Sequence, residues 1–146
     1  MRLHTVFDQG RFIGSGLQRL TDDNSLWLFS RRASGLRVLL IVAPIRTWSF
    51  PNIANLGMEF ISAVVWQDGH DLRVLDLNAE RGGPVEEDER FRQWIDRRVA
   101  WALDYHTPDV VGLGGIITQY GMIRRIARLV RMARPQATIV LGGGIA

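Results

Sequence analysis

The sequence predicts an α/β fold, a three-layer sandwich in which helices cover both faces of a parallel β-sheet. Two observations predict it. From Leu36 onward, short aliphatic runs alternate with longer segments whose apolar residues recur at helical spacing, which is typical of βαβ units. The aliphatic runs are also continuous rather than interrupted by polar residues, as expected for strands buried on both faces.

The first half of the pattern predicts two strands joined by a crossover helix. Residues 38–42 form a continuous apolar run and predict a central strand. A helix is predicted over residues 55–67, and its apolar face is assigned to Leu56, Phe60, Ala63 and Val64. A second strand is predicted over residues 72–77, and a polar loop follows it at residues 80–84.

The second half repeats the alternation. Acidic residues crowd the start of a helix predicted over residues 88–105, where the helix dipole favours negative charge. Residues 110–113 then predict a third strand, residues 119–133 a third helix and residues 137–141 a fourth strand. This order of elements favours a flavodoxin-like or Rossmann-like domain with strand order 2-1-3-4.

The chain divides into residues 1–35, an N-terminal extension, and residues 36–146, the α/β domain. Residues 25–30 favour a strand, and we expect the extension to add a hairpin or a helix–strand unit that covers a sheet edge. A doubly wound fold normally continues into another helix and strand after its fourth strand. We therefore expect the domain to be truncated at its carboxyl end.

Composition excludes several classes of function. None of the 146 residues is cysteine, which excludes disulfides, thiolate zinc sites, iron–sulfur ligation and cysteine nucleophiles. The net charge is only +3, with acidic residues interspersed among the basic ones, so nucleic acid is not an expected partner. No apolar window is long enough for a membrane span and the start does not resemble a secretion signal, so we expect a cytoplasmic protein without a membrane partner.

Three loops follow the first, third and fourth strands, at residues 43–52, 114–121 and 142–144. In an open parallel sheet these loops meet at the carboxyl edge, where ligands bind. Two of them are rich in glycine, which lets a flat or bulky ligand approach the backbone and leaves amide N–H groups free. The alternative is that they are only tight turns between strands and helices.

Common nucleotide sites do not fit these loops. Asp76 at the end of the second strand suits a dinucleotide site. Such a site also needs glycines directly after the first strand, and the first glycine there is Gly57. A phosphate-binding P-loop needs a lysine, and the chain has none. The acid of a phosphoacceptor domain is also missing, because Asp109 precedes its strand and faces the opposite edge.

Five ordered segments resemble the amino-terminal cobalamin-binding domain of cobalamin-dependent radical-SAM enzymes. They are LLIVAP, PNIANLG, GHDLRVLD, DVVGL and IVLGG, which begin at residues 39, 51, 69, 109 and 139. The resemblance covers residues 35–146. It implies a corrinoid-binding carrier module that works with a radical-SAM domain in cis or in trans. An iron–sulfur cluster and S-adenosylmethionine would belong to that domain, and the chain would catalyse nothing alone.

In cobalamin domains, a Ser-x-Leu after the third strand and a Gly-Gly after the fourth line the channel for the dimethylbenzimidazole tail. Gly114-Gly115-Ile116 resembles the first segment, with glycine in place of serine, and Gly142-Gly143 resembles the second. The resemblance implies that the corrinoid binds at these loops, with the cofactor-binding residues Pro44, Arg46, Thr47, Trp48, Ser49, Gly114, Gly115, Ile116, Thr118, Gln119, Gly142, Gly143 and Gly144.

The cobalt ligand of methionine-synthase-like domains is absent from this sequence. Those domains place Asp-x-His-x-x-Gly after the first strand, and no histidine stands there in this chain. His70 follows Asp68 and Gly69, but it lies at the amino ends of the strands and is interpreted as a structural residue of a turn. The resemblance therefore implies base-off cobalamin bound without a protein histidine.

Two alternatives from other classes stay open. One is a flavodoxin-like domain that binds a flavin or nucleotide, and the other is a non-catalytic interaction module. Individual side chains also have structural alternatives, such as packing for Trp48 and the start of a helix for Gln119. The arginines of the third helix, Arg124, Arg125, Arg128 and Arg131, are interpreted as a solvated face that could dock a partner.

Overall fold

The computed structural model describes residues 35–50 and 56–144, and before them only the backbone of four short strands. These four are β1 (Phe7–Asp8), β2 (Arg11–Phe12), β3 (Leu17–Arg19) and β4 (Leu26–Phe29). The remaining strands are β5 (Arg37–Val42), β6 (Asp71–Asp76), β7 (Val110–Gly115) and β8 (Thr138–Gly143). The helices are α1 (Leu56–Gln67), α2 (Leu77–Glu80), α3 (Glu89–His106), the short 3₁₀ turn η1 (Ile117–Gln119) and α4 (Tyr120–Ala133).

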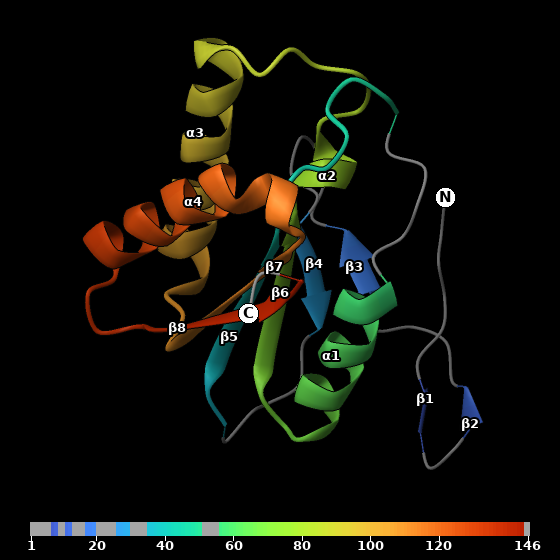
Figure 1. The fold of residues 1–146 in the computed structure, drawn as a ribbon. Helices are drawn as coiled ribbons and strands as arrows, with labels where there is room; N and C mark the ends of the chain where they lie inside the picture. Colours follow the sequence, from blue (N-terminus) through green and yellow to red (C-terminus); the bar gives the residue numbers. More distant parts are fainter. Residues whose placement is uncertain are drawn as a thin grey trace.

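The main sheet has six strands in the order β3-β4-β6-β5-β7-β8 (Figure 1). Strands β6, β5, β7 and β8 are parallel, which confirms the predicted order 2-1-3-4. Each parallel connection carries a helix, as βαβ units require. The parallel arrangement brings the ends of β5, β7 and β8 to one edge of the sheet, where the three predicted loops begin.

The N-terminal strands extend the sheet beyond β6. Strands β3 and β4 form an antiparallel pair, and β4 pairs in turn with β6. The expected accessory hairpin at a sheet edge is therefore present, whereas β1 and β2 pair only with each other. The boundary proposed at residue 35 stays a prediction, and the turns between these strands lie outside the described residues.

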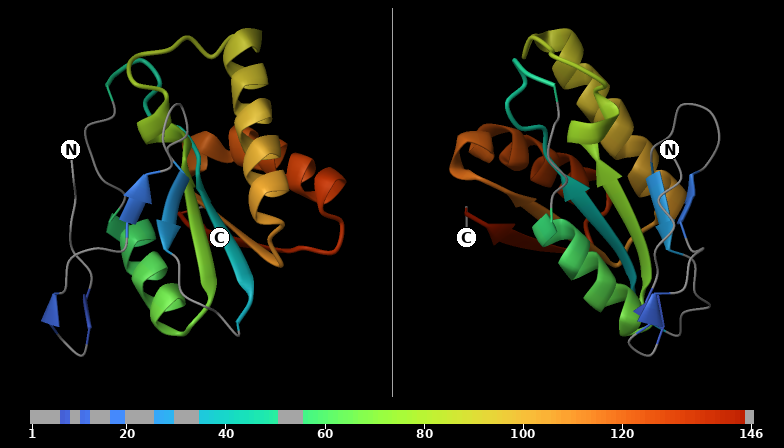
Figure 2. Two further views of the ribbon diagram at one scale, coloured as in Figure 1. Left: turned by 180° about the vertical axis from the view of Figure 1, so that it is seen from behind. Right: turned by 90° about the vertical axis from the view of Figure 1, so that its right-hand side faces the viewer.

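Alternate residues of the central strand β5 face two separate apolar clusters. Leu39 and Ile41 pack with α3 and α4, whereas Leu40 and Val42 pack with Met58 of α1. Figure 1 and the left view of Figure 2 show α1 on one side of the strands, with α3 and α4 on the other. Burial on both faces explains why the strand reads as a continuous apolar run.

The predicted apolar face of α1 was wrong. Leu56, Phe60, Ala63 and Val64 are exposed, Phe60 by 73%, and the helix instead packs through Met58, Ser62, Val65 and Trp66. Because apolar residues surround most of this helix, their spacing could not select the face that meets the sheet. The predicted first residue of the helix, residue 55, lies outside the described residues.

Helix α2 begins at the last residue of the predicted strand 72–77 and ends at the first residue of the predicted loop 80–84. The Asp76 carboxylate accepts hydrogen bonds from the backbone N–H groups of Asn78 and Ala79, at 2.9 and 3.0 Å. Asp76 is therefore the N-cap of α2. Burial raises the pKa of its carboxyl group above the ordinary value, and the two backbone hydrogen bonds oppose that shift.

At the amino ends of the strands, Arg37 and Asp109 close a clip between β5 and β7. Arg37 donates to the Asp109 carboxylate through Nε at 3.2 Å, Nη2 at 2.8 Å and its backbone N–H at 2.9 Å. These side-chain and backbone hydrogen bonds lower the pKa of Asp109 from 3.8 to about 2. Asp109 faces away from the carboxyl edge, as the sequence predicts.

This clip predicts a pH-dependent stability. Because the pKa of Asp109 is lower in the folded chain, its ionised carboxylate stabilises the fold. This stabilisation is complete above about pH 4 and is lost as the pH falls to about 2. At pH 7, Asp109→Ala is expected to lower the free energy of unfolding by about 1 kcal/mol, since both side chains are partly exposed. Urea unfolding from pH 2 to 7 measures this, with exposed Asp68→Ala as the control; a difference that persists at pH 2 would contradict it.

Candidate functional site at the carboxyl edge of the sheet

The structure brings the loops after β5, β7 and β8 together. The Gln119 side chain links the end of β7 to the end of β5, through bonds to the carbonyl oxygens of Ala43 and Pro44. Strands β7 and β8 pair up to Gly115 and Gly143. These contacts place all three predicted loops along one continuous edge. Residues 51–55, which belong to the first loop and to the PNIANLG segment, lie outside the described residues.

Gln119 holds this edge from inside. Its side chain is 6% exposed, and Nε2 donates to the oxygens of Ala43 and Pro44 at 2.9 and 2.6 Å. Its Oε1 accepts from the backbone N–H of Ile116 at 2.9 Å. With its donors and acceptor engaged by backbone groups, the amide holds the loops in position.

Two residues that sequence reasoning missed hold the first loop. Arg81 donates to the carbonyl oxygens of Ile45, Arg46, Thr47 and Gly83, over 2.5–3.3 Å. Asn78 Oδ1 accepts from the backbone N–H of Ile45 and from Arg81 Nε, each at 3.2 Å. Burial lowers the pKa of Arg81 below the ordinary arginine value. No local pattern marks their role, because their partners in the first loop lie more than 30 positions away in the chain.

The predicted residues of the first loop separate into inward and outward groups. Thr47 is buried and donates its hydroxyl hydrogen to Glu87 at 2.8 Å, and the Ser49 hydroxyl donates to the Arg46 oxygen at 3.2 Å. Arg46 adopts the left-handed region with φ of +47°, which reverses the chain. Trp48, which follows this reversal, is 77% exposed. Of the predicted site residues in the described part of this loop, Trp48 and Arg46 are thus the exposed ones.

A strip of glycines lies on the α1 side of the sheet. A Cβ atom on Gly112 would meet Leu40 and one on Gly114 would meet Met58, so both glycines face the α1 layer. Gly142 is in register with Gly114 and shares its face, and a Cβ there would meet no atom within 4 Å. Leu40 therefore covers Gly112 and Met58 of α1 lies near Gly114, whereas the surface at Gly142 is open.

Two other predicted glycines have a structural role. Gly143 has φ of +81°, and a Cβ there would stand 2.6 Å from the backbone oxygen of Gly115. A Cβ on Gly115 would stand 2.6 Å from Gln119 Oε1. The close approach of the Gly115 backbone and the positive φ therefore require glycine at position 143, whereas at position 115 the space is taken by the Gln119 and Ile123 side chains. Gly144 is exposed next to them.

A groove with a volume of about 710 Å³ opens on the other side of the edge, between the loop after β5 and helices α3 and α4. Seven of the predicted site residues line it: Pro44, Arg46, Thr47, Trp48, Ile116, Thr118 and Gln119. Ser49 and the five predicted glycines lie outside it. The predicted site thus divides into a glycine strip and a groove, which adjoin at the carboxyl edge.

The described histidines lie away from this edge. His70 Nδ1 accepts from the backbone N–H of Leu36 at 3.1 Å, in the turn before β6, as the sequence predicts. His106 is buried, with Nε2 at 3.1 and 3.2 Å from the carbonyl oxygens of Asp71 and Val38, and burial lowers its pKa. The described part of the chain contains no group of three or more His, Cys, Asp or Glu side chains placed to hold a metal ion.

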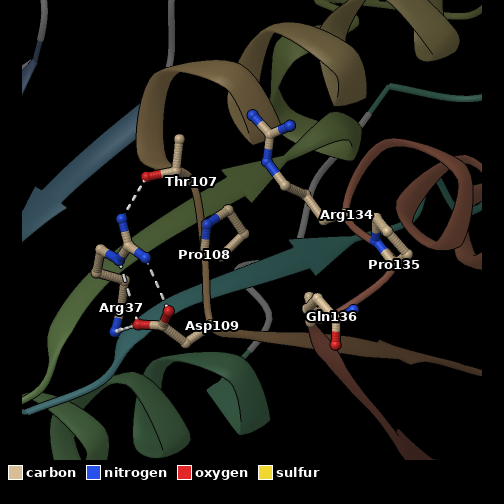
Figure 3. Close-up of a pocket in the computed structure, with 8 residues that line it drawn as sticks. Arg37, Thr107, Pro108, Asp109, Arg134, Pro135 and Gln136 are labelled. Atoms are coloured by element: carbon tan, nitrogen blue, oxygen red, sulfur yellow. Dashed lines mark hydrogen bonds and ion pairs between the residues drawn. The ribbon is translucent and has the colours of Figure 1, made fainter.

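A second cavity, of about 290 Å³, lies at the opposite end of the strands (Figure 3). It is lined by Arg37, Asp109 and Arg134 among others. Figure 3 shows Arg37 pointing to Asp109 and Thr107, and the guanidinium group of Arg37 donates hydrogen bonds to both of them. This cavity is therefore a gap beside the structural clip.

No helix over the described ranges is long and apolar enough to cross a membrane.

Comparisons with known proteins agree with the fold. A family model described as the B12 binding domain matches residues 49–146. Cytidylyl-2-hydroxyethylphosphonate methyltransferase of Streptomyces wedmorensis is 29% identical over 94 residues, which cover 60% of this chain and 18% of that protein. No solved structure matches. The family match confirms the predicted resemblance to cobalamin-binding domains and includes the loops after β7 and β8. This chain belongs to the B12 binding domain family.

Proposed function

We propose that this chain is the cobalamin-carrying module of a radical-SAM methyltransferase system. Membership of the B12 binding domain family supports a corrinoid ligand. A relative named as a methyltransferase supports the reaction class, and the matched segment spans 18% of that protein, as a carrier module within a larger enzyme would. Bound cobalamin would supply a cobalt centre that accepts and delivers a methyl group.

The observation that carries the proposal is the pair of glycines, Gly114 and Gly142, that lie in register on the α1 side of the carboxyl edge. Gly142 stands in open space, and a Cβ atom on Gly114 would meet only Met58. A planar heterocycle with a ribose and phosphate could lie against Gly142, since neither glycine carries a side chain. Gly114 stands where other cobalamin domains have serine, and its backbone would still contact the nucleotide tail.

The other residues at the edge would position the corrin and exclude water from it. Trp48 and Ile116 are exposed apolar side chains on two of the loops. Gln119 and Arg81 hold those loops in place from inside, through bonds to backbone carbonyl oxygens. The first loop carries no general base aimed outward. We therefore propose that the module binds and presents the corrinoid and performs no chemistry alone.

We propose further that cobalt is bound without a protein histidine, in the base-off form. His70 and His106 lie toward the amino ends of the strands, and both bond to backbone groups there. The chain has no cysteine to ligate an iron–sulfur cluster. The cluster and S-adenosylmethionine would therefore belong to a radical-SAM domain in cis or in trans.

Titration with hydroxocobalamin tests this function directly. We expect the purified chain to retain about one corrinoid per chain after gel filtration, with the absorption spectrum of displaced dimethylbenzimidazole. A parallel titration with flavin mononucleotide should leave the chain free of flavin. Retention of flavin in place of corrinoid, or of neither, would contradict the proposal.

Two valine variants separate ligand binding from folding. Gly142→Val places a side chain in open space on the glycine strip, so it is expected to leave the unfolding temperature unchanged. It should weaken corrinoid binding at least about tenfold by filling the surface on which the tail lies. The control is Thr138→Val at the opposite end of β8, which is exposed and lies outside the groove. Equal binding by the two variants would remove the glycine strip from the site.

A further inference from the structure

The groove beside the carboxyl edge has an unusual concentration of positive charge. Five arginines line it: Arg46, Arg92, Arg124, Arg125 and Arg128. The lining carboxylates are only those of Glu87 and Asp96. The excess of three positive charges equals the formal net charge of the entire chain. The net charge therefore says little about this surface, because acidic residues elsewhere balance the other arginines.

Two arginines of α4, Arg124 and Arg128, have no neutralising carboxylate among the described residues. Helix α4 contains no acidic residue, and Arg124 and Arg128 are one helical turn apart, a spacing at which like charges repel. No ion pair joins either guanidinium to a carboxylate of the described residues, and both side chains are exposed. A bound anion would relieve this repulsion.

One arginine of the groove is already oriented. Arg125 donates to the Asp96 carboxylate through Nε and Nη2 at 2.8 and 2.6 Å, which fixes the guanidinium plane and leaves Nη1 unused by that pair. Arg92 is only loosely paired, at 3.7 Å from Glu89. Thr118, also in the lining, adds an exposed hydroxyl group. Guanidinium and hydroxyl donors that converge on one concavity suit the oxygens of a phosphate group.

We propose that this groove binds a small phosphate ester carrying two or more negative charges, of the diphosphate class. Its volume of about 710 Å³ falls within the range of small-molecule sites. Several guanidinium groups can bind a diphosphate from different directions, whereas a single carboxylate would engage only one of them. This inference goes beyond corrinoid binding, because four of the five arginines belong to α3 and α4, whereas the glycine strip lies on the α1 side of the sheet.

The test uses the chain without corrinoid, so its outcome is independent of the cobalamin titration. ADP and inorganic pyrophosphate are titrated at low salt by calorimetry, with uncharged adenosine as a reference. We expect both phosphates to bind, adenosine not to bind, and the affinity to fall as salt is added. Tryptophan fluorescence should also respond, because Trp48 lines the groove, and Trp48→Phe should remove that response.

Charge variants locate the binding. Arg124→Gln with Arg128→Gln is expected to weaken pyrophosphate binding at least about tenfold, since two charge-assisted contacts are lost. The control is Arg97→Gln on α3, which removes a positive charge outside the groove and should change the affinity less than about twofold. Absence of pyrophosphate binding, or equal binding by the variants and the wild type, would overturn the proposal. Binding of an acidic peptide but not of pyrophosphate would also overturn it, in favour of a protein partner.

Discussion

Arg81→Met is expected to lower the free energy of unfolding by about 2–3 kcal/mol, because several hydrogen bonds from a charged group are lost together. Arg81 donates to four backbone carbonyl oxygens and to Asn78, and these bonds hold the loop after β5. Methionine keeps much of the side-chain volume and removes every donor. Urea unfolding measures the loss, and hydrogen exchange of the Ser49 amide, which bonds to the Arg46 oxygen, reports the local effect.

Two further variants define the role of Arg81. Arg81→Lys keeps the positive charge but lacks the planar fork of donors, so it should recover only part of the lost stability. Arg90→Met on the exposed surface of α3 is the control for replacing an arginine, and it should change the stability by less than about 0.5 kcal/mol. If Arg81→Met unfolds at the same urea concentration as the wild type, the loop is held by other contacts.

The second large effect is expected at Gln119. Gln119→Leu removes the donors to Ala43 and Pro44 and the acceptor for the Ile116 N–H, and it leaves these backbone groups without side-chain partners. Because Gln119 is buried, the expected loss is about 2–4 kcal/mol of unfolding free energy, measured by urea unfolding. Gln93→Leu, at an exposed position of α3, is the control and should have little effect.

Gln119→Glu provides a sharper comparison. At neutral pH its carboxylate would face the Ala43 and Pro44 carbonyl oxygens, which repel it, whereas the protonated acid can donate to one of them. The pKa of this introduced glutamate should therefore be raised in the folded chain. Relative to the wild type, the variant should gain stability as the pH falls from 7 to 4. A difference that does not vary with pH would show that the amide does not act through these two oxygens.

The local pattern predicted the elements because each strand carries its own signal. Residues 38–42 are buried on both faces, and residues 110–113 are buried on one face and half-buried on the other, so their apolar runs are continuous. Glycine at strand ends likewise marked the positions where the backbone must come close, and Gly143 does so against Gly115. The order of the parallel strands follows from chain connectivity, since right-handed crossovers allow few arrangements.

The side-chain geometry of the candidate edge was not predictable in the same way. Gln119 was predicted as a cofactor-binding residue or the start of a helix, and neither interpretation indicates its bonds to carbonyl oxygens 75 and 76 positions away. Arg81 was assigned only to a polar loop, and the carbonyl oxygens that it binds around Ile45 become its neighbours when β5 and β6 pair. A local pattern carries no information on such partners.

The sequence by itself determined the α/β class, the order of the four parallel strands and the edge at which their loops meet. Hydrophobic burial and glycine conformation act over a few residues, and both leave a readable pattern. Only the tertiary structure decided which face of α1 is buried, which residues hold the first loop, and that the arginines of α4 gather beside it. Those features depend on packing contacts, hydrogen bonds and charge interactions between groups that are distant in sequence. These interactions form only when the fold brings the partners into contact, so no short segment carries a signal for them.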